Sequence, residues 1–149
     1  MIRVWWMVTA LACAYSLGRA PASVPSVSLG EVSAPTAEPG LKEAIERSVA
    51  DAAARRTRVG EGPALRVTVL SATARTAAAD GVLAEASLSL RFQLDGGGGV
   101  ELTGRRGFPS GADPEAASAA RAEAFAALAD ELAAEAVLRL LSAPSGGAP

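Results

Sequence analysis

Apolar residues recur at two different periods along the chain, and the period changes from one segment to the next. The cleanest alternation runs through residues 82–94, where every second residue is apolar from Val82 to Leu94. Such alternation predicts a strand with one apolar face. Less regular alternation and β-branched residues predict further strands at about 26–33, 65–75 and 100–108. Asp80-Gly81 and Asp95-Gly96 separate the last three runs and predict hairpins.

Two other segments follow the helical period. Between residues 40 and 56, Leu41, Ile45 and Val49 lie on one apolar stripe, which predicts a helix. Asp113-Pro114-Glu115 combines an N-cap residue, proline at the first helical position and an acid in the first turn. A second helix is therefore predicted from this point to about Leu141.

The order of these elements is strand, helix, strand, strand, strand, helix. It predicts a two-layer α+β sandwich, in which both helices pack on one face of a four-stranded, mostly antiparallel sheet. The domain is expected to span residues 26–141, with a flexible tail at 142–149. The second sheet face is predicted to be polar, so it needs either water or a partner.

The N-terminus has the layout of a bacterial lipoprotein leader. Arg3 precedes a short apolar run that ends in small residues before Cys13, the only cysteine of the 149 residues. A positive start, an apolar run and small residues before the cut are typical of a signal peptide. The run is shorter than the roughly 20 residues that span a bilayer. We expect residues 1–12 to be removed, Cys13 to be acylated, and residues 13–25 to form a lipidated linker. The alternative is a buried N-terminal segment with an incidental thiol.

Composition excludes several kinds of chemistry. The chain has no histidine, which excludes Ser-His-Asp and Cys-His catalytic arrangements. A single cysteine forms no internal disulfide, and no Cys/His cluster suggests a metal. The net charge of −2 argues against a nucleic-acid partner. We therefore expect a protein that is not an enzyme and has no cofactor or metal.

Arginines in the predicted strands are the remaining candidates for binding. Arg66 and Arg91 lie on the polar sides of their strands, and Arg105-Arg106 interrupts the last one. Guanidinium groups bind phosphate or carboxylate through two parallel hydrogen bonds. These four arginines are candidate ligands for an anion. The alternative is a solvated sheet face with edge charges that discourage aggregation.

Two short motifs and the element order resemble one known family, the LptE-type lipopolysaccharide-assembly lipoproteins of the outer membrane. Cys13-Ala14-Tyr15-Ser16-Leu17-Gly18 is similar to the family's Cys-Gly-Tyr-Ser/Thr-Leu opening. Glu38-Pro39-Gly40-Leu41 resembles its Glu-Pro-Gly-Leu-Glu turn, although the asparagine common before that turn is missing.

The resemblance implies a lipoprotein anchored on the periplasmic side of the outer membrane. Its domain would plug a β-barrel partner, the lipopolysaccharide translocon, or assist assembly of that barrel, and would bind lipopolysaccharide. The phosphates of that lipid would account for Arg66, Arg91, Arg105 and Arg106. The alternative function is a free-standing periplasmic lipoprotein that binds a small ligand or a cell-wall component.

Overall fold

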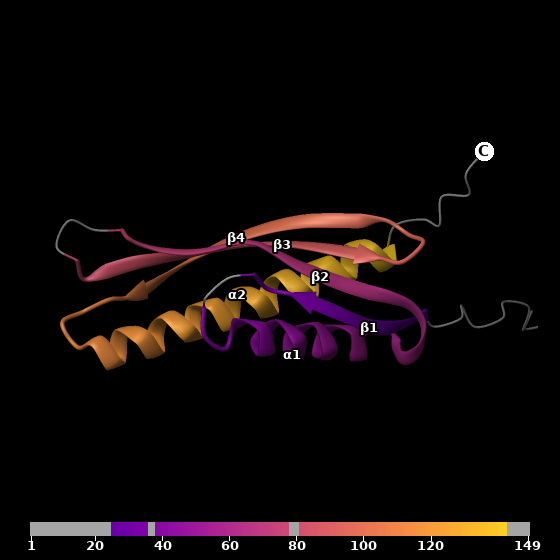
Figure 1. The fold of residues 1–149 in the computed structure, drawn as a ribbon, viewed down its shortest axis with the longest axis horizontal. Helices are drawn as coiled ribbons and strands as arrows, with labels where there is room; N and C mark the ends of the chain where they lie inside the picture. Colours follow the sequence, from indigo (N-terminus) through magenta and orange to yellow (C-terminus); the bar gives the residue numbers. More distant parts are fainter. Residues whose placement is uncertain (1–24, 36–37, 78–80, 143–149) are drawn as a thin grey trace, which may run out of the picture.

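Two helices cover one face of a four-stranded sheet in the computed structural model, which describes residues 25–35, 38–77 and 81–142 (Figure 1). The two-layer α+β fold and the order of its elements are confirmed. In chain order the elements are β1 (Ser26–Ser33), α1 (Leu41–Ala54), β2 (Arg58–Thr76), β3 (Leu83–Leu94), β4 (Gly99–Pro109) and α2 (Pro114–Ser142).

The strands lie in the sheet in the order in which they occur along the chain, β1-β2-β3-β4. β2, β3 and β4 form two antiparallel hairpins, whereas β1 pairs with β2 in parallel. The sheet is therefore mixed, with one parallel and two antiparallel pairings, rather than mostly antiparallel as predicted. The reason is that α1 connects β1 to β2, and a helical crossover returns the chain in the same direction.

A β-bulge in β2 changes which residues face the helices. Val69 pairs with Leu90 and Ser71 pairs with Ser89, so Leu70 is an extra residue on β2. Val67 and Val69 are buried before the bulge, whereas Ala72 and Ala74 pack against the core after it. Because side chains alternate between the faces of a strand, one inserted residue reverses the alternation.

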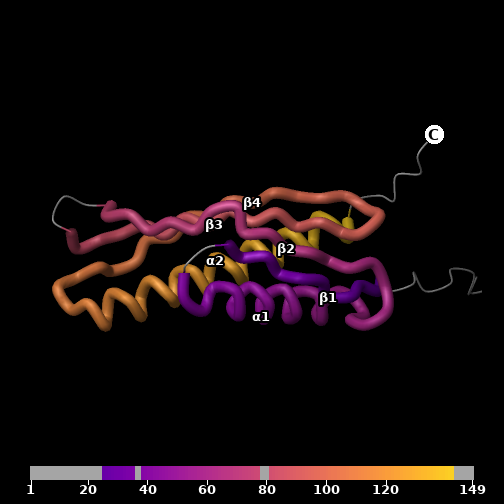
Figure 2. Tube along the Cα trace, in the orientation of Figure 1, coloured from indigo at the N-terminus to yellow at the C-terminus, as the bar shows by residue number. Residues whose placement is uncertain are grey.

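The core lies between the sheet and the helices. α1 packs on β1 and β2, α2 packs obliquely on β3 and β4, and the two helices pack against each other (Figure 2). Among the described residues, the largest fully buried side chains are Phe92, Ile45, Leu88, Leu90, Leu128 and Val67. The predicted apolar alternation of β3 is confirmed except at Val82, which precedes the strand and is 52% exposed.

The start of α2 agrees with its predicted capping. The Oδ1 atom of Asp113 accepts hydrogen bonds from the backbone N–H groups of Glu115 and Ala116, at 3.0 and 3.4 Å. These bonds satisfy donors that have no partner inside the helix. α1 begins differently, because Gly40 occupies its N-cap position with a φ of 72° and no side-chain cap.

Four of the sequence-based predictions fall on residues outside the described part of the chain: the leader, Cys13, the lipidated linker up to residue 24 and the tail from residue 143. Asp80 of the first predicted hairpin turn also lies outside it. Within the described residues, no helix combines the length and the apolar character that crossing a membrane requires.

Candidate functional site

The sheet face turned away from the helices carries polar side chains on all three antiparallel strands, and we call it the open face. Its hydroxyls lie in register across the strands, because Ser71 pairs with Ser89 and Ser89 with Thr103. The Ser89 and Thr103 hydroxyls are hydrogen-bonded at 2.8 Å. The open face comprises Arg66, Thr68, Ser71, Thr73 and Arg75 of β2, Glu85, Ser87, Ser89, Arg91 and Gln93 of β3, and Glu101, Thr103 and Arg105 of β4.

Three of the four predicted anion-binding arginines lie on the open face, and each is paired with a carboxylate. Arg66 contacts Asp95 at 3.0 Å. Arg91 donates to Glu101 at 2.7 Å across the β3–β4 ladder. Arg105 lies 3.9 Å from Glu85. The side chains of these arginines are 62%, 50% and 71% exposed, so their remaining donors face solvent.

Arg106 lies on the opposite face of the sheet from Arg105. It donates to Glu131 of α2 at 2.7 Å, and so contributes to packing between sheet and helix. Consecutive residues of a strand point to opposite faces, so Arg105 and Arg106 cannot bind one ligand from one side. The structure therefore brings Arg66, Arg91 and Arg105 to one face and excludes Arg106 from it.

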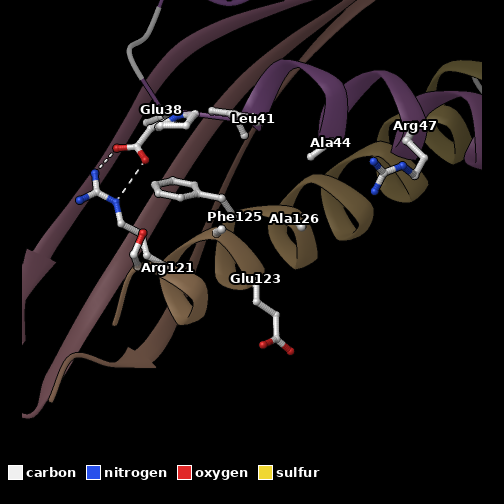
Figure 3. A pocket seen from close by; sticks show the side chains of 13 residues that line it. Glu38, Leu41, Ala44, Arg47, Arg121, Glu123, Phe125 and Ala126 are labelled. Atoms are coloured by element: carbon white, nitrogen blue, oxygen red, sulfur yellow. Dashed lines mark hydrogen bonds and ion pairs between the residues drawn. The ribbon is translucent and has the colours of Figure 1, made fainter. Parts of the chain in front are cut away.

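A second candidate site is a cleft of about 860 Å³ between the N-terminal part of α1 and the first half of α2 (Figure 3). Its wall combines apolar and charged groups, with Arg47 projecting from α1 and Glu123 from α2. Arg47 is exposed, and no carboxylate of the described residues forms an ion pair with it. The lining residues are Glu38, Pro39, Gly40, Leu41, Ala44, Arg47, Ala72, Ser118, Arg121, Ala122, Glu123, Phe125 and Ala126.

An ion pair between Glu38 and Arg121 closes one end of the cleft. Both nitrogens Nε and Nη2 of Arg121 donate to the carboxylate, and the Nε–Oε2 distance is 3.1 Å (Figure 3). The Glu38 side chain is only 15% exposed. The Glu38-Pro39-Gly40 turn is thereby joined to α2, 83 residues further along the chain. Sequence reasoning found the turn as a motif but gave no signal for its partner.

This ion pair is expected to contribute to stability. Removing one partner of a fully buried pair costs about 3–5 kcal/mol. We expect Arg121→Met to cost less, roughly 1–2 kcal/mol, because the arginine side chain is 43% exposed to screening solvent. Denaturant unfolding of the full chain measures the change.

The matched control is Arg139→Met. Arg139 pairs with Glu135 one turn away on α2, and both side chains are about half exposed, at 56% and 46%. An exposed pair of this kind contributes about 0.3–0.5 kcal/mol. Equal losses of unfolding free energy from the two variants would show that the Glu38–Arg121 pair stabilises the fold no more than an exposed pair does.

The described residues contain no group of three or more His, Cys, Asp or Glu side chains that is arranged to hold a metal ion. Their buried side-chain nitrogens and oxygens all have hydrogen-bond partners. The candidate surfaces are therefore the open face and the cleft.

Comparison with known proteins identifies a shared fold. No family model and no curated protein matches this chain. A Caulobacter crescentus protein, provisionally named a lipoprotein, is 20% identical, with 78% of this chain and 92% of that one covered and a TM-score of 0.57. The minor lipoprotein of Acinetobacter baumannii is 16% identical over 80% and 92%, with a TM-score of 0.52. PelC of Paraburkholderia phytofirmans, solved as a dodecamer, is 18% identical over 79% and 88%, with a TM-score of 0.50. This chain thus has a fold that is also found in bacterial lipoproteins.

Proposed function

We propose that this protein is a lipoprotein subunit of the lipopolysaccharide translocon and not an enzyme. It is anchored through Cys13 at the periplasmic side of the outer membrane. Its domain plugs a β-barrel partner or assists assembly of that barrel, and it binds lipopolysaccharide. The observation that carries the proposal is the open face, a polar sheet surface that no described helix or strand covers.

The chemistry of the open face supports a polar partner. A monomeric sheet with one face in water is common, so polarity alone selects no partner. The interior of an outer-membrane barrel, however, is polar and presents donors and acceptors. The row of Ser71, Ser89 and Thr103 together with the arginine–carboxylate pairs offers complementary groups over three strands. The two short motifs at Cys13 and Glu38 and the fold shared with lipoproteins support the same proposal.

The lipopolysaccharide-binding part of the proposal rests on Arg66, Arg91 and Arg105. Each has one carboxylate partner, which occupies part of the five donors of a guanidinium group. A lipid phosphate can use the remaining donors, with the neighbouring arginines adding positive charge. Arg106 has no part in this contact, because it faces α2.

A bulky side chain on the open face tests the barrel contact. Ser87→Trp places a large ring at the centre of the open face, whereas Ala119→Trp places it on an exposed position of α2. The full native chain, extracted in detergent, is expected to retain the translocon barrel, identified by mass spectrometry. We expect Ser87→Trp to lose most of the barrel and Ala119→Trp to keep it. A native chain that retains no barrel protein would overturn the proposal.

The cleft favours a second candidate function, that of a free-standing lipoprotein that binds a small ligand. Its volume of about 860 Å³ falls in the usual range for ligand sites, and Arg47 and Arg121 line it. This function predicts no barrel partner. It also predicts that Arg47→Ala, on the cleft, causes a greater loss of the protein's function in cells than Ser87→Trp on the open face.

A further inference from the structure

The outer edge of β4 is the longest unpaired strand edge in the described part of the chain. β4 is the last strand of the sheet and has 11 residues, which pair with β3 without any register shift. At the opposite edge, β1 has 8 residues and two register shifts in its pairing with β2. Irregular short edges discourage further pairing, whereas long regular edges are ready templates for another strand.

The hydrogen bonds at the two ends of the β3–β4 ladder show which residues of β4 face outward. Ser110 N donates to Val82 O at 2.8 Å, and Leu94 N donates to Gly98 O at 3.1 Å. Hydrogen-bonded and non-hydrogen-bonded pairs alternate in an antiparallel ladder. The even-numbered residues of β4 therefore bond to β3. The N–H and C=O groups of Glu101, Thr103 and Arg105 point away from the sheet.

The side chains at this edge are complementary to themselves. If two copies of β4 pair antiparallel with Thr103 at the symmetry axis, Glu101 of each copy lies directly opposite Arg105 of the other. Moving the axis by one residue in either direction places Glu101 opposite Thr103 or Gly107 instead. Only the register centred on Thr103 matches opposite charges, and directly opposed charges of opposite sign stabilise a strand pair.

Contacts within each copy extend this complementarity. Glu101 already contacts Arg91 on β3, and Arg105 lies near Glu85 on the same strand. Pairing through β4 would bring Arg91 and Glu101 of one copy beside Arg105 and Glu85 of the other. Positive and negative side chains would then alternate from one copy to the next. On the helix side, Leu102 would lie opposite Gly104, which has no side chain to clash with it.

We propose that two copies of this protein associate through β4 and form a symmetric, continuous eight-stranded sheet. The strand that pairs with this edge is β4 of a second copy, because an antiparallel copy places Glu101 opposite Arg105 on both sides of the axis. This pairing uses the backbone edge of β4, whose Glu101, Thr103 and Arg105 side chains also lie on the open face, whereas the barrel contact is tested at Ser87 of β3. Either proposal can therefore fail without the other.

Disulfide trapping tests the pairing directly. In the proposed register the two Thr103 Cα atoms would be about 5.5 Å apart, within the range that a disulfide bridges. The test uses the full chain with Cys13→Ser, so that the introduced thiol is the only one. We expect Thr103→Cys to give a covalent dimer under mild oxidation. Thr73→Cys, on the same face but on the inner strand β2, should stay monomeric.

Charge exchange tests the register. Arg105→Glu or Glu101→Arg alone places like charges opposite each other at two symmetric positions. We expect each to weaken dimerisation roughly tenfold or more, as measured by analytical ultracentrifugation. The two changes together should restore much of the loss. Circular dichroism checks that each variant is folded. A monomeric native chain, an absent Thr103→Cys cross-link, or dimerisation that ignores both charge changes would each overturn the proposal.

Discussion

Replacing Phe92 by alanine is expected to cost about 3–5 kcal/mol of unfolding free energy, the largest stability effect of any change considered. Phe92 has no solvent exposure and lies on β3, paired with Val67 on one side and Val100 on the other. Truncation would leave a cavity between the sheet and the helices that its rigid neighbours cannot fill. A small domain has only about 5–15 kcal/mol in total, so the variant should be close to unfolding.

Denaturant titration measures this effect through a lower midpoint at an unchanged slope. Leu70→Ala is the matched control, since Leu70 is an apolar residue of the same sheet but is 43% exposed at the bulge. We expect this control to cost less than about 1 kcal/mol. Similar losses from both variants would mean that the core is not centred on Phe92.

Replacing Cys13 by serine is expected to move the protein from the membrane fraction to the soluble fraction. A single acyl chain holds a protein only marginally, whereas more than one chain holds it stably. The acylation proposed for Cys13 carries three chains, all of which need the thiol or the new N-terminus that follows cleavage at this residue. Serine provides no sulfur for that modification.

Fractionation after carbonate washing, with mass spectrometry of the mature N-terminus, measures the release. Ser23→Ala in the same segment is the control and should leave the protein in the membrane fraction. Retention of the Cys13→Ser variant on membranes that lack the barrel partner would contradict acylation at Cys13. Retention that depends on the barrel would instead support the barrel contact.

The elements with a strong repeat were predictable from sequence, and those shaped by distant contacts were not. β3 and α2 each carry many apolar residues at one period, so both were predicted to within a few residues. β2 begins at Arg58, earlier than predicted. Its first part contains Gly60, Gly62 and Pro63, which interrupt the alternation of apolar residues. This part is a strand because it pairs with β1, a contact that the local sequence does not reveal.

The candidate site shows the same division. Period-two alternation placed Arg66 and Arg91 on the polar face, and the structure agrees. The same rule separates Arg105 from Arg106, but neither the carboxylate partners nor the Glu38–Arg121 contact could be read from the chain. Those pairs depend on how the strands and helices come together, and Glu38 and Arg121 are 83 residues apart.

The bulge at Leu70 has a consequence for aligning this chain with others of the same fold. Before it, odd-numbered residues of β2 face the helices, and after it even-numbered residues do. A relative without the bulge would match both halves of β2 only if the alignment contains a one-residue gap at Leu70. An ungapped alignment would set Ser71, Thr73 and Arg75 against core residues of the relative. Two structurally equivalent strands would then have a falsely low sequence similarity.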